Sequence, residues 1–149
     1  MSIVIDASVA LKWVLDEPGK EAADTLLDEE LIAPALWLIE VANALWRRSR
    51  QGQIRADEAR TRLLELTNAP VTTYAIERDI LAAADLAESL AHPVYDCLYL
   101  AMAIRERTFV VTADRRFLAV VDGSPDLRGA VRRLEPSVPR SPSGRIEKP

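Results

Sequence analysis

Short runs of apolar residues alternate along the chain with longer segments in which apolar positions recur at helical spacing. The short runs are typical of buried strands and occupy residues 3–5, 31–33, 71–73, 109–112 and 131–134. The longer segments predict helices over residues 9–15, 20–30, 34–49, 56–66, 75–90 and 95–105, and a further helix after residue 114. This alternation predicts an α/β domain, a three-layer α/β/α sandwich in which helices cover both faces of a parallel sheet.

The alternating pattern ends near residue 134. From Glu135 onward the composition is polar and rich in proline and serine, which is typical of a flexible extension. We therefore expect one domain over residues 1–134, large enough to bury its own core, and a flexible tail over residues 135–149.

Charge and cysteine content narrow the class of protein. A net charge of −4 argues against a protein that coats nucleic acid by bulk attraction. The single cysteine, Cys97, excludes an internal disulfide framework and favours a reducing compartment; because it lies in an apolar run, we expect a buried structural thiol. The start of the chain is interrupted by Asp6 and Lys12 and does not resemble a signal peptide, and no segment is long and apolar enough to span a bilayer. We therefore expect a cytoplasmic protein without a membrane partner.

Four of the 23 acidic residues stand apart from the solvated charges on polar helix faces. Three of them are the only charged residue in an apolar stretch: Asp6 in residues 3–11, Glu40 in residues 32–46 and Asp96 in residues 93–104. The fourth, Asp114, follows the predicted strand 109–112 after one small residue. An ionised carboxylate in apolar surroundings is costly unless a cation or hydrogen-bond donor accompanies it, so these acids indicate a bound divalent metal.

The predicted topology supports this interpretation. Asp6 and Asp114 stand at the carboxyl ends of strands, where open α/β sheets bind ligands, and Asp96 falls in the first turn of its helix. His92 is the only histidine and there is no Cys/His pattern, so an all-oxygen ligand set favours Mg²⁺ or Mn²⁺ over zinc. Such a metal activates water for in-line displacement at phosphorus, which needs no nucleophilic side chain.

Each acid taken alone also has a structural interpretation. Asp6 and Asp114 could cap the helices that follow them, and the hydroxyl of Ser8 is another possible cap. Asp96 could be a first-turn acid favoured by the helix dipole. For Glu40 the alternative is an ion pair with an arginine of another helix.

Four motifs together resemble the PIN-domain family and, within it, the VapC toxins of type II toxin–antitoxin modules. They are Val-Ile-Asp-Ala-Ser-Val at 4–9, Glu-Val-Ala-Asn-Ala-Leu at 40–45, Tyr-Asp-Cys-Leu-Tyr-Leu-Ala at 95–101 and Thr-Ala-Asp at 112–114. The resemblance covers residues 3 to about 134 and implies a PIN-like sandwich with Mg²⁺-dependent endoribonuclease activity on RNA. It implies catalytic and metal-binding roles for all four acids, most directly for Asp6 and Asp96.

The resemblance also implies roles for other residues and for partners. Ser8 and Thr112 occupy the family's hydroxyl positions and would support a carboxylate or contact a phosphate. Asn43, one turn after Glu40, would orient that carboxylate or face solvent. The family implies a homodimer and a cognate antitoxin that blocks the acidic site.

Arginines near the acids are candidates for holding the RNA backbone. Arg115 and Arg116 directly follow Asp114, and a solvated helix start is an equal alternative for them. For the arginines in residues 47–50 we favour a solvated helix end. The three tryptophans are more typical of core or dimer contacts than of base stacking.

Three other functions remain as alternatives. A phosphatase or receiver domain usually has a second acid beside or two after the first and a reactive lysine, whereas Ala7 and Ser8 follow Asp6. A non-catalytic module of the same fold would use the acids only to hold a basic partner. A housekeeping PIN nuclease would act without an antitoxin.

Overall fold

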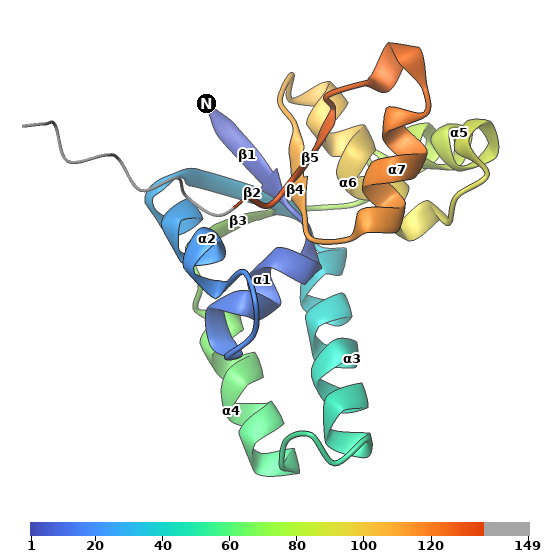
Figure 1. Cartoon of the computed structure of the whole chain (residues 1–149). Helices are drawn as coiled ribbons and strands as arrows, with labels where there is room; N and C mark the ends of the chain where they lie inside the picture. Colours follow the sequence, from blue (N-terminus) through green and yellow to red (C-terminus); the bar gives the residue numbers. More distant parts are fainter. Residues whose placement is uncertain (136–149) are drawn as a thin grey trace, which may run out of the picture.

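A computed structural model describes residues 1–135 of the chain. Five parallel strands form one sheet in the order β3-β2-β1-β4-β5 (Figure 1). The strands are β1 Ser2–Ile5, β2 Glu30–Pro34, β3 Val71–Tyr74, β4 Val110–Thr112 and β5 Val131–Arg133. The predicted α/β fold with a parallel sheet is confirmed.

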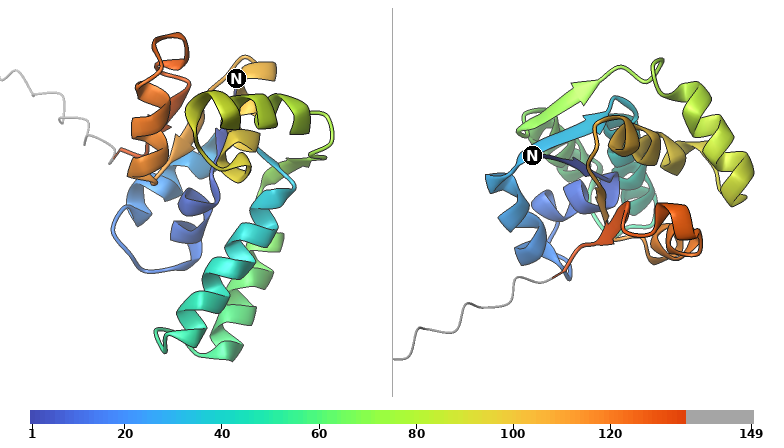
Figure 2. Two further views of the ribbon diagram at one scale, coloured as in Figure 1. Left: turned by 90° about the vertical axis from the view of Figure 1, so that its right-hand side faces the viewer. Right: turned by 90° about the horizontal axis from the view of Figure 1, so that it is seen from above.

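Seven α-helices flank the sheet within the described residues. They are α1 Ala7–Val14, α2 Lys20–Thr25, α3 Leu36–Arg50, α4 Ala56–Thr67, α5 Ile80–Leu90, α6 Val94–Arg105 and α7 Arg115–Asp122. Two 3₁₀ turns, Leu26–Asp28 and Pro125–Leu127, complete the set. Helices α6 and α7 pack on the sheet with α5 against α6, whereas α1 and α2 pack together and the α3–α4 hairpin extends past α1 (Figures 1 and 2). None of the helices in residues 1–135 is long and apolar enough to cross a membrane.

The core surrounds the central strand β1 and helix α6. Val4 and Ile5 of β1 are fully buried because strands pair with β1 on both sides and helices cover both faces. Tyr99 and Met102 of α6 are equally buried. The apolar run of α6, interrupted only by Asp96, therefore reflects burial of its middle residues, 97–103, and brings that one charge to the sheet.

The helix predicted over residues 20–30 is wrong in its second half. Helix α2 ends at Thr25, whose hydroxyl donates a hydrogen bond to the carbonyl of Ala22 at 2.6 Å, and a 3₁₀ turn follows. Glu30 already belongs to β2, where it pairs with Ser2 of β1. The helix has to end early because pairing with β1 requires extended backbone at this point.

Two other predicted helices begin later than expected. Helix α3 begins at Leu36 because Pro34 still pairs with Tyr74 in the sheet. Helix α5 begins at Ile80, and residues 75–79 form a turn. This turn is fixed by Asp79, which is buried and accepts hydrogen bonds from Nε and Nη2 of Arg105 at 2.8 and 3.0 Å. Of the tail predicted over residues 135–149, all but Glu135 lies outside the described residues.

Candidate active site

Asp6 is the centre of the candidate site. It follows β1 directly, is only 5% exposed, and its Oδ2 accepts hydrogen bonds from Ser8 Oγ and Thr112 Oγ1, both at 2.7 Å. Asp6 occupies the N-cap position of α1, but its side chain makes no capping hydrogen bond. Both capping alternatives at this helix are therefore wrong: the carboxylate of Asp6 and the hydroxyl of Ser8 bond to each other and to the end of β4.

Asp114 lies where β4 runs into α7. Its backbone N–H donates to Thr112 Oγ1 at 3.0 Å, so Thr112 links Asp114 to Asp6. Its Oδ1 accepts from the backbone N–H groups of Arg116 and Phe117 at 2.9 and 3.2 Å, which makes Asp114 the N-cap of α7. The capping interpretation of Asp114 is confirmed, and the cap stands beside Asp6.

Asp96 lies in the first turn of α6, as expected, and is held by the only histidine. Nε2 of His92 lies 2.6 Å from Oδ2 of Asp96, and because an ionised carboxylate only accepts, this nitrogen carries the proton. His92 is buried, and its ring stacks on Phe117 of α7 with 5.4 Å between centroids. The histidine is thus fixed from two sides and in turn fixes Asp96.

Glu40 projects from α3 toward α6. The hydroxyl of the fully buried Tyr99 donates to Oε1 of Glu40 at 2.7 Å. Glu40 forms no ion pair within residues 1–135, so no arginine of the helices described there is its partner. Within this part of the chain Glu40 therefore has a neutral hydrogen-bond donor and no positive charge as its partner.

Burial and the charges of neighbouring carboxylates raise the pKa values of two of these acids. Burial raises the pKa of Asp6 against the effect of its two hydroxyl partners, and the charges on Asp96 and Asp114 raise it further. Burial raises the pKa of Glu40 to about 7 despite the hydrogen bond from Tyr99, and Asp6 and Asp96 again add to the shift. The charges of Asp96, Asp114 and Glu40 thus each interact with that of Asp6, and this shared negative charge suits a cation.

The donor chemistry fits a hard divalent cation. Each of the four acids uses one carboxylate oxygen for the protein bonds described above, and the other has no hydrogen-bond partner in residues 1–135. No three Asp, Glu, His or Cys side chains of this part of the chain are positioned to hold one metal ion. The four acids thus have free carboxylate oxygens but do not form a ready-made metal site. Which of them bind a metal ion remains a prediction.

The other candidate residues divide into two groups. Ser8 and Thr112 bond to Asp6, and Arg115 lines a cavity together with Ala113 beside the site. Asn43 and Arg116 have exposed side chains, and Asn43 makes no side-chain hydrogen bond to Glu40.

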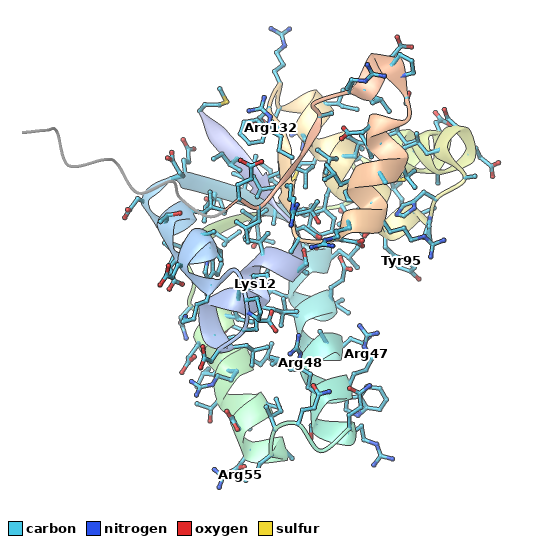
Figure 3. The ribbon with its side chains drawn as sticks, viewed as in Figure 1. Lys12, Arg47, Arg48, Arg55, Tyr95 and Arg132 are labelled. Atoms are coloured by element: carbon cyan, nitrogen blue, oxygen red, sulfur yellow. The ribbon has the colours of Figure 1, made fainter. Side chains whose placement is uncertain are left out.

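The arginines at the end of α3 and the tryptophans make no hydrogen bond or ion pair with the four acids within residues 1–135. Figure 3 shows Arg47 and Arg48 along α3 and Arg55 at the far tip of the hairpin; Arg48 pairs with Glu17 at 3.0 Å. Trp37 is buried in the core, whereas Trp46 is 58% exposed.

The sequence does not reveal the roles of His92 and Tyr99. Tyr99 stands three residues after Asp96 in an apolar run, and nothing in that run marks a hydrogen bond to α3. His92 precedes Asp96 by four residues, but α6 begins only at Val94, so helical spacing does not predict their contact. Cys97 is fully buried and burial raises its pKa to about 11, in keeping with a structural thiol.

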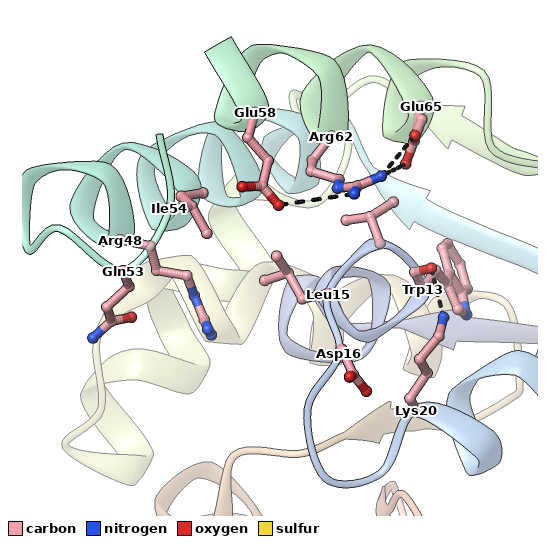
Figure 4. Close-up of a pocket in the computed structure, with 11 residues that line it drawn as sticks. Trp13, Leu15, Asp16, Lys20, Arg48, Gln53, Ile54, Glu58, Arg62 and Glu65 are labelled. Atoms are coloured by element: carbon pink, nitrogen blue, oxygen red, sulfur yellow. Dashed lines mark hydrogen bonds and ion pairs between the residues drawn. The ribbon is translucent and has the colours of Figure 1, made fainter. Parts of the chain in front are cut away.

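A cavity of about 540 Å³, shown in Figure 4, has none of the four acids among its lining residues. It lies between α1 and the α3–α4 hairpin, and its basic side chains already have acidic partners. Arg62 bonds to Glu65 at 3.0 Å and pairs with Glu58, while Arg48 pairs with Glu17. These internal pairs leave little free charge for a ligand.

Fold and site together define a parallel α/β domain with an acidic site at the carboxyl edge of its sheet. The PIN domain family model matches residues 3–123. The chain therefore belongs to the PIN-domain family.

Three relatives illustrate this similarity. Ribonuclease VapC3 of Pyrobaculum aerophilum is 34% identical over 123 residues, which cover 78% of this chain and 92% of that protein. The crystal structure of PAE2754 from the same organism has a TM-score of 0.69 at 21% identity and covers 90% of this chain and 84% of that one. A toxin–antitoxin complex from Klebsiella pneumoniae has a TM-score of 0.58 at 19% identity and covers 87% of this chain and 95% of that one. The two structures support the fold, and VapC3 extends the likeness to the sequence of a ribonuclease.

Proposed function

We propose that this chain is a divalent-metal-dependent endoribonuclease that acts in the cytoplasm as the toxin of a VapBC-type toxin–antitoxin pair. The observation that carries the proposal is the group of acids around Asp6, in which the pKa values of Asp6 and Glu40 are raised by burial and by neighbouring carboxylates. The 34% identity to Ribonuclease VapC3 supports the reaction class.

The protein's own residues have distinct tasks in this proposal. Ser8 and Thr112 hold one oxygen of Asp6 so that the other faces the site. His92 and Tyr99 do the same for Asp96 and Glu40. Free oxygens of Asp6 and Asp96 would hold Mg²⁺ or Mn²⁺ directly, with Glu40 and Asp114 acting through water; the ion when bound supplies charge neutralisation at the phosphate and an acidified water. With its pKa at about 7, Glu40 suits proton uptake from water near neutral pH.

The receiver-domain alternative loses support at the site. The two lysines in residues 1–135 are engaged elsewhere: Lys12 bonds to Glu17 and the carbonyl of Pro18, and Lys20 bonds to the carbonyl of Trp13. Neither bonds to Asp6, whereas phosphotransfer at an aspartate usually involves a lysine.

The test is cleavage of single-stranded RNA by the purified protein. We expect cleavage in Mg²⁺ or Mn²⁺, none in EDTA, and a loss of about 100-fold or more in Asp96→Asn and Asp6→Asn, since several kcal/mol of transition-state stabilisation disappear. Asp85→Asn on the exposed side of α5 removes the same charge away from the site and should cleave like the wild type. Equal cleavage by wild type and Asp96→Asn would contradict the catalytic role of the acids, and no cleavage by the wild type would leave a non-catalytic binding module as the better description.

The antitoxin and the homodimer need separate tests. The Klebsiella structure is a toxin–antitoxin complex, which supports an antitoxin partner. We expect expression of this chain alone to arrest growth and co-expression of the adjacent small gene to restore it; arrest without any such gene would favour a housekeeping nuclease. Light scattering at several concentrations tests the homodimer.

A further inference from the structure

Two neighbouring cavities lie beside the acidic site, between α2 and β5. The first, about 350 Å³, is lined by Lys12, Pro18, Gly19, Ala22, Ala113, Arg115, Arg133 and Leu134. The second, about 370 Å³, includes Phe109 and Arg132 and shares Ala22, Arg133 and Leu134 with the first. Because they share these residues, the two cavities adjoin, and together they are here called the α2–β5 groove. Figure 3 shows Lys12 on α1 and Arg132 on β5, which line its first and second parts.

The groove begins next to Asp6. The backbone N–H of Ala113 in its wall donates to Ser8 Oγ at 3.0 Å, and that hydroxyl donates to Asp6 at 2.7 Å. Arg133 is the register partner of Thr112, which donates to the same carboxylate oxygen. If one phosphate of a nucleic-acid strand binds at Asp6, the neighbouring nucleotides on one side therefore lie next to the groove.

The charge of the groove is opposite to that of the site and of the whole chain. Its first part contains three basic side chains and no acid, although the chain carries a net charge of −4. Lys12 is paired with Glu17, but Arg115 and Arg133 form no ion pair within residues 1–135 and are exposed. Two free guanidinium groups beside four carboxylates suit the phosphates of a bound strand, since arginine binds phosphate in a bidentate manner.

The second part of the groove offers a flat surface. The guanidinium carbon of Arg132 lies 3.6 Å from the centroid of the Phe109 ring, so the two planar groups contact each other. Arg132 also donates to the carbonyl of Gly129 at 3.3 Å and is an exposed residue. An unstacked base binds such a guanidinium or aromatic plane, and only single-stranded nucleic acid offers such a base.

We propose that the α2–β5 groove binds the single-stranded RNA on one side of the cleaved bond. Arg115 and Arg133 contact its phosphates, and a base stacks on Arg132 over Phe109. This inference rests on the proposed ribonuclease function and adds the substrate's path and strandedness. An acidic protein segment is the competing occupant; the stacking surface and the contact with the phosphate-cleaving site favour RNA.

The experiment compares Arg133→Ala, Arg115→Ala and Arg132→Ala with Arg50→Ala, which removes one exposed positive charge at the end of α3. Steady-state cleavage of a fluorescent single-stranded RNA gives kcat and KM for each variant in Mg²⁺. Affinity for the same RNA is measured in an Asp96→Asn background at several salt concentrations. Circular dichroism confirms that each variant folds.

We expect Arg115→Ala and Arg133→Ala to raise KM by about 5- to 10-fold with kcat within about 2-fold, because a phosphate contact binds substrate and transition state alike. Each should also lower the slope of log affinity against log salt by about 0.7. Arg132→Ala should weaken binding by about 5-fold or more with little change of this slope, because stacking is largely uncharged. Arg50→Ala should match the wild type.

Failure of the groove and failure of the ribonuclease function give different results. If the wild type cleaves RNA and all three groove variants behave like Arg50→Ala, the groove proposal is overturned. Unchanged KM combined with weaker inhibition by the antitoxin identifies the groove as a protein-binding surface and also overturns it. If the wild type cleaves no RNA but the groove variants still lose RNA affinity, the groove proposal stands and the ribonuclease proposal fails.

Discussion

At the scale of single residues, His92 and Tyr99 act on the site through the carboxylates they hold. Each bonds one oxygen of an acid and leaves the other free. A carboxylate without such a partner rotates about its last torsion, and ordering it on binding then costs conformational entropy. The two donors therefore orient the acids before a cation or substrate arrives.

His92→Phe and His92→Gln separate this orienting effect from packing. Phenylalanine keeps an aromatic ring against Phe117 but cannot donate to Asp96, whereas the side-chain amide of glutamine can reach the position of Nε2. We expect His92→Phe to lower the cleavage rate by about 10- to 100-fold and to require more Mg²⁺, and His92→Gln to recover much of the loss. The measurement is cleavage rate against Mg²⁺ concentration, with melting temperature as the check on folding. If His92→Phe and His92→Gln cleave at the same rate, the hydrogen bond to Asp96 has no effect and His92 only fills space.

The sequence could locate the acids but not these partners. A single charged residue in an apolar stretch is visible in the sequence, and its burial is costly unless it has a function or a partner. This is how the sequence identifies Asp6, Glu40 and Asp96. Histidine and tyrosine are ordinary members of buried surfaces, so their presence signals nothing. Their bonds depend on how α3, α6 and α7 pack, which no local pattern specifies.

At the scale of elements, the errors of prediction lie at helix ends rather than in the kind of element. Hydrophobic periodicity indicates which residues face the core. The same apolar pattern can continue from a turn into the helix that follows, so it does not mark where the helix begins. Residues 75–79 illustrate this: the turn there is fixed by the pair of Asp79 with Arg105, two residues 26 positions apart. Boundaries set by distant partners cannot be found from a local window.

The junction between α5 and α6 contains a strained position that is open to test. Ala91 ends α5 in the left-handed conformation with φ 50°, directly before His92. A side chain there costs roughly 1 kcal/mol, whereas glycine adopts this conformation freely but gains entropy in the unfolded chain. We therefore expect Ala91→Gly to raise the free energy of unfolding by about 0.5 kcal/mol, measured by urea denaturation. Ala82→Gly, in the exposed first turn of α5, should lower it by up to about 1 kcal/mol, and a loss in both variants would contradict the strain.

At the scale of the whole molecule, the strand order determines where the charges meet. The chain order alone does not place β1 between β2 and β4, yet this order brings Asp6 beside Thr112 and leaves β5 with Arg132 and Arg133 at the edge. A parallel sheet and its reactive edge could be predicted from alternating strands and helices. The position of the basic groove could not, because residues more than a hundred positions apart contribute to it.

Crowding of the acids makes the stability of the fold depend on pH. Glu40 has a pKa of about 7 in the folded protein and an ordinary, lower pKa when unfolded, so the folded state binds more protons between these values. Stability in EDTA should therefore fall as the pH rises from about 4.5 to 7 and level off above it, with Asp6 acting in the same direction. Because Glu40 is partly exposed, we expect its share of the loss to be only about 1 kcal/mol. Glu40→Gln should remove that share, whereas Glu88→Gln on exposed α5 should not.

A bound cation should reverse this trend, because it binds the ionised carboxylates that repel one another in the fold. Mg²⁺ at ten times its Kd stabilises a folded protein by about 1.4 kcal/mol, which corresponds to roughly 4 °C in Tm for a chain of this size. We expect this shift at pH 8, a smaller one at pH 6 where Glu40 is largely protonated, and little in Asp6→Asn at either pH. Asp85→Asn should retain the full shift. Thermal melts with and without Mg²⁺ measure these differences. If the Mg²⁺-induced shift in Tm does not depend on pH and is the same in Asp6→Asn, the cation binds elsewhere on the surface. The raised pKa values would then have no connection with metal binding.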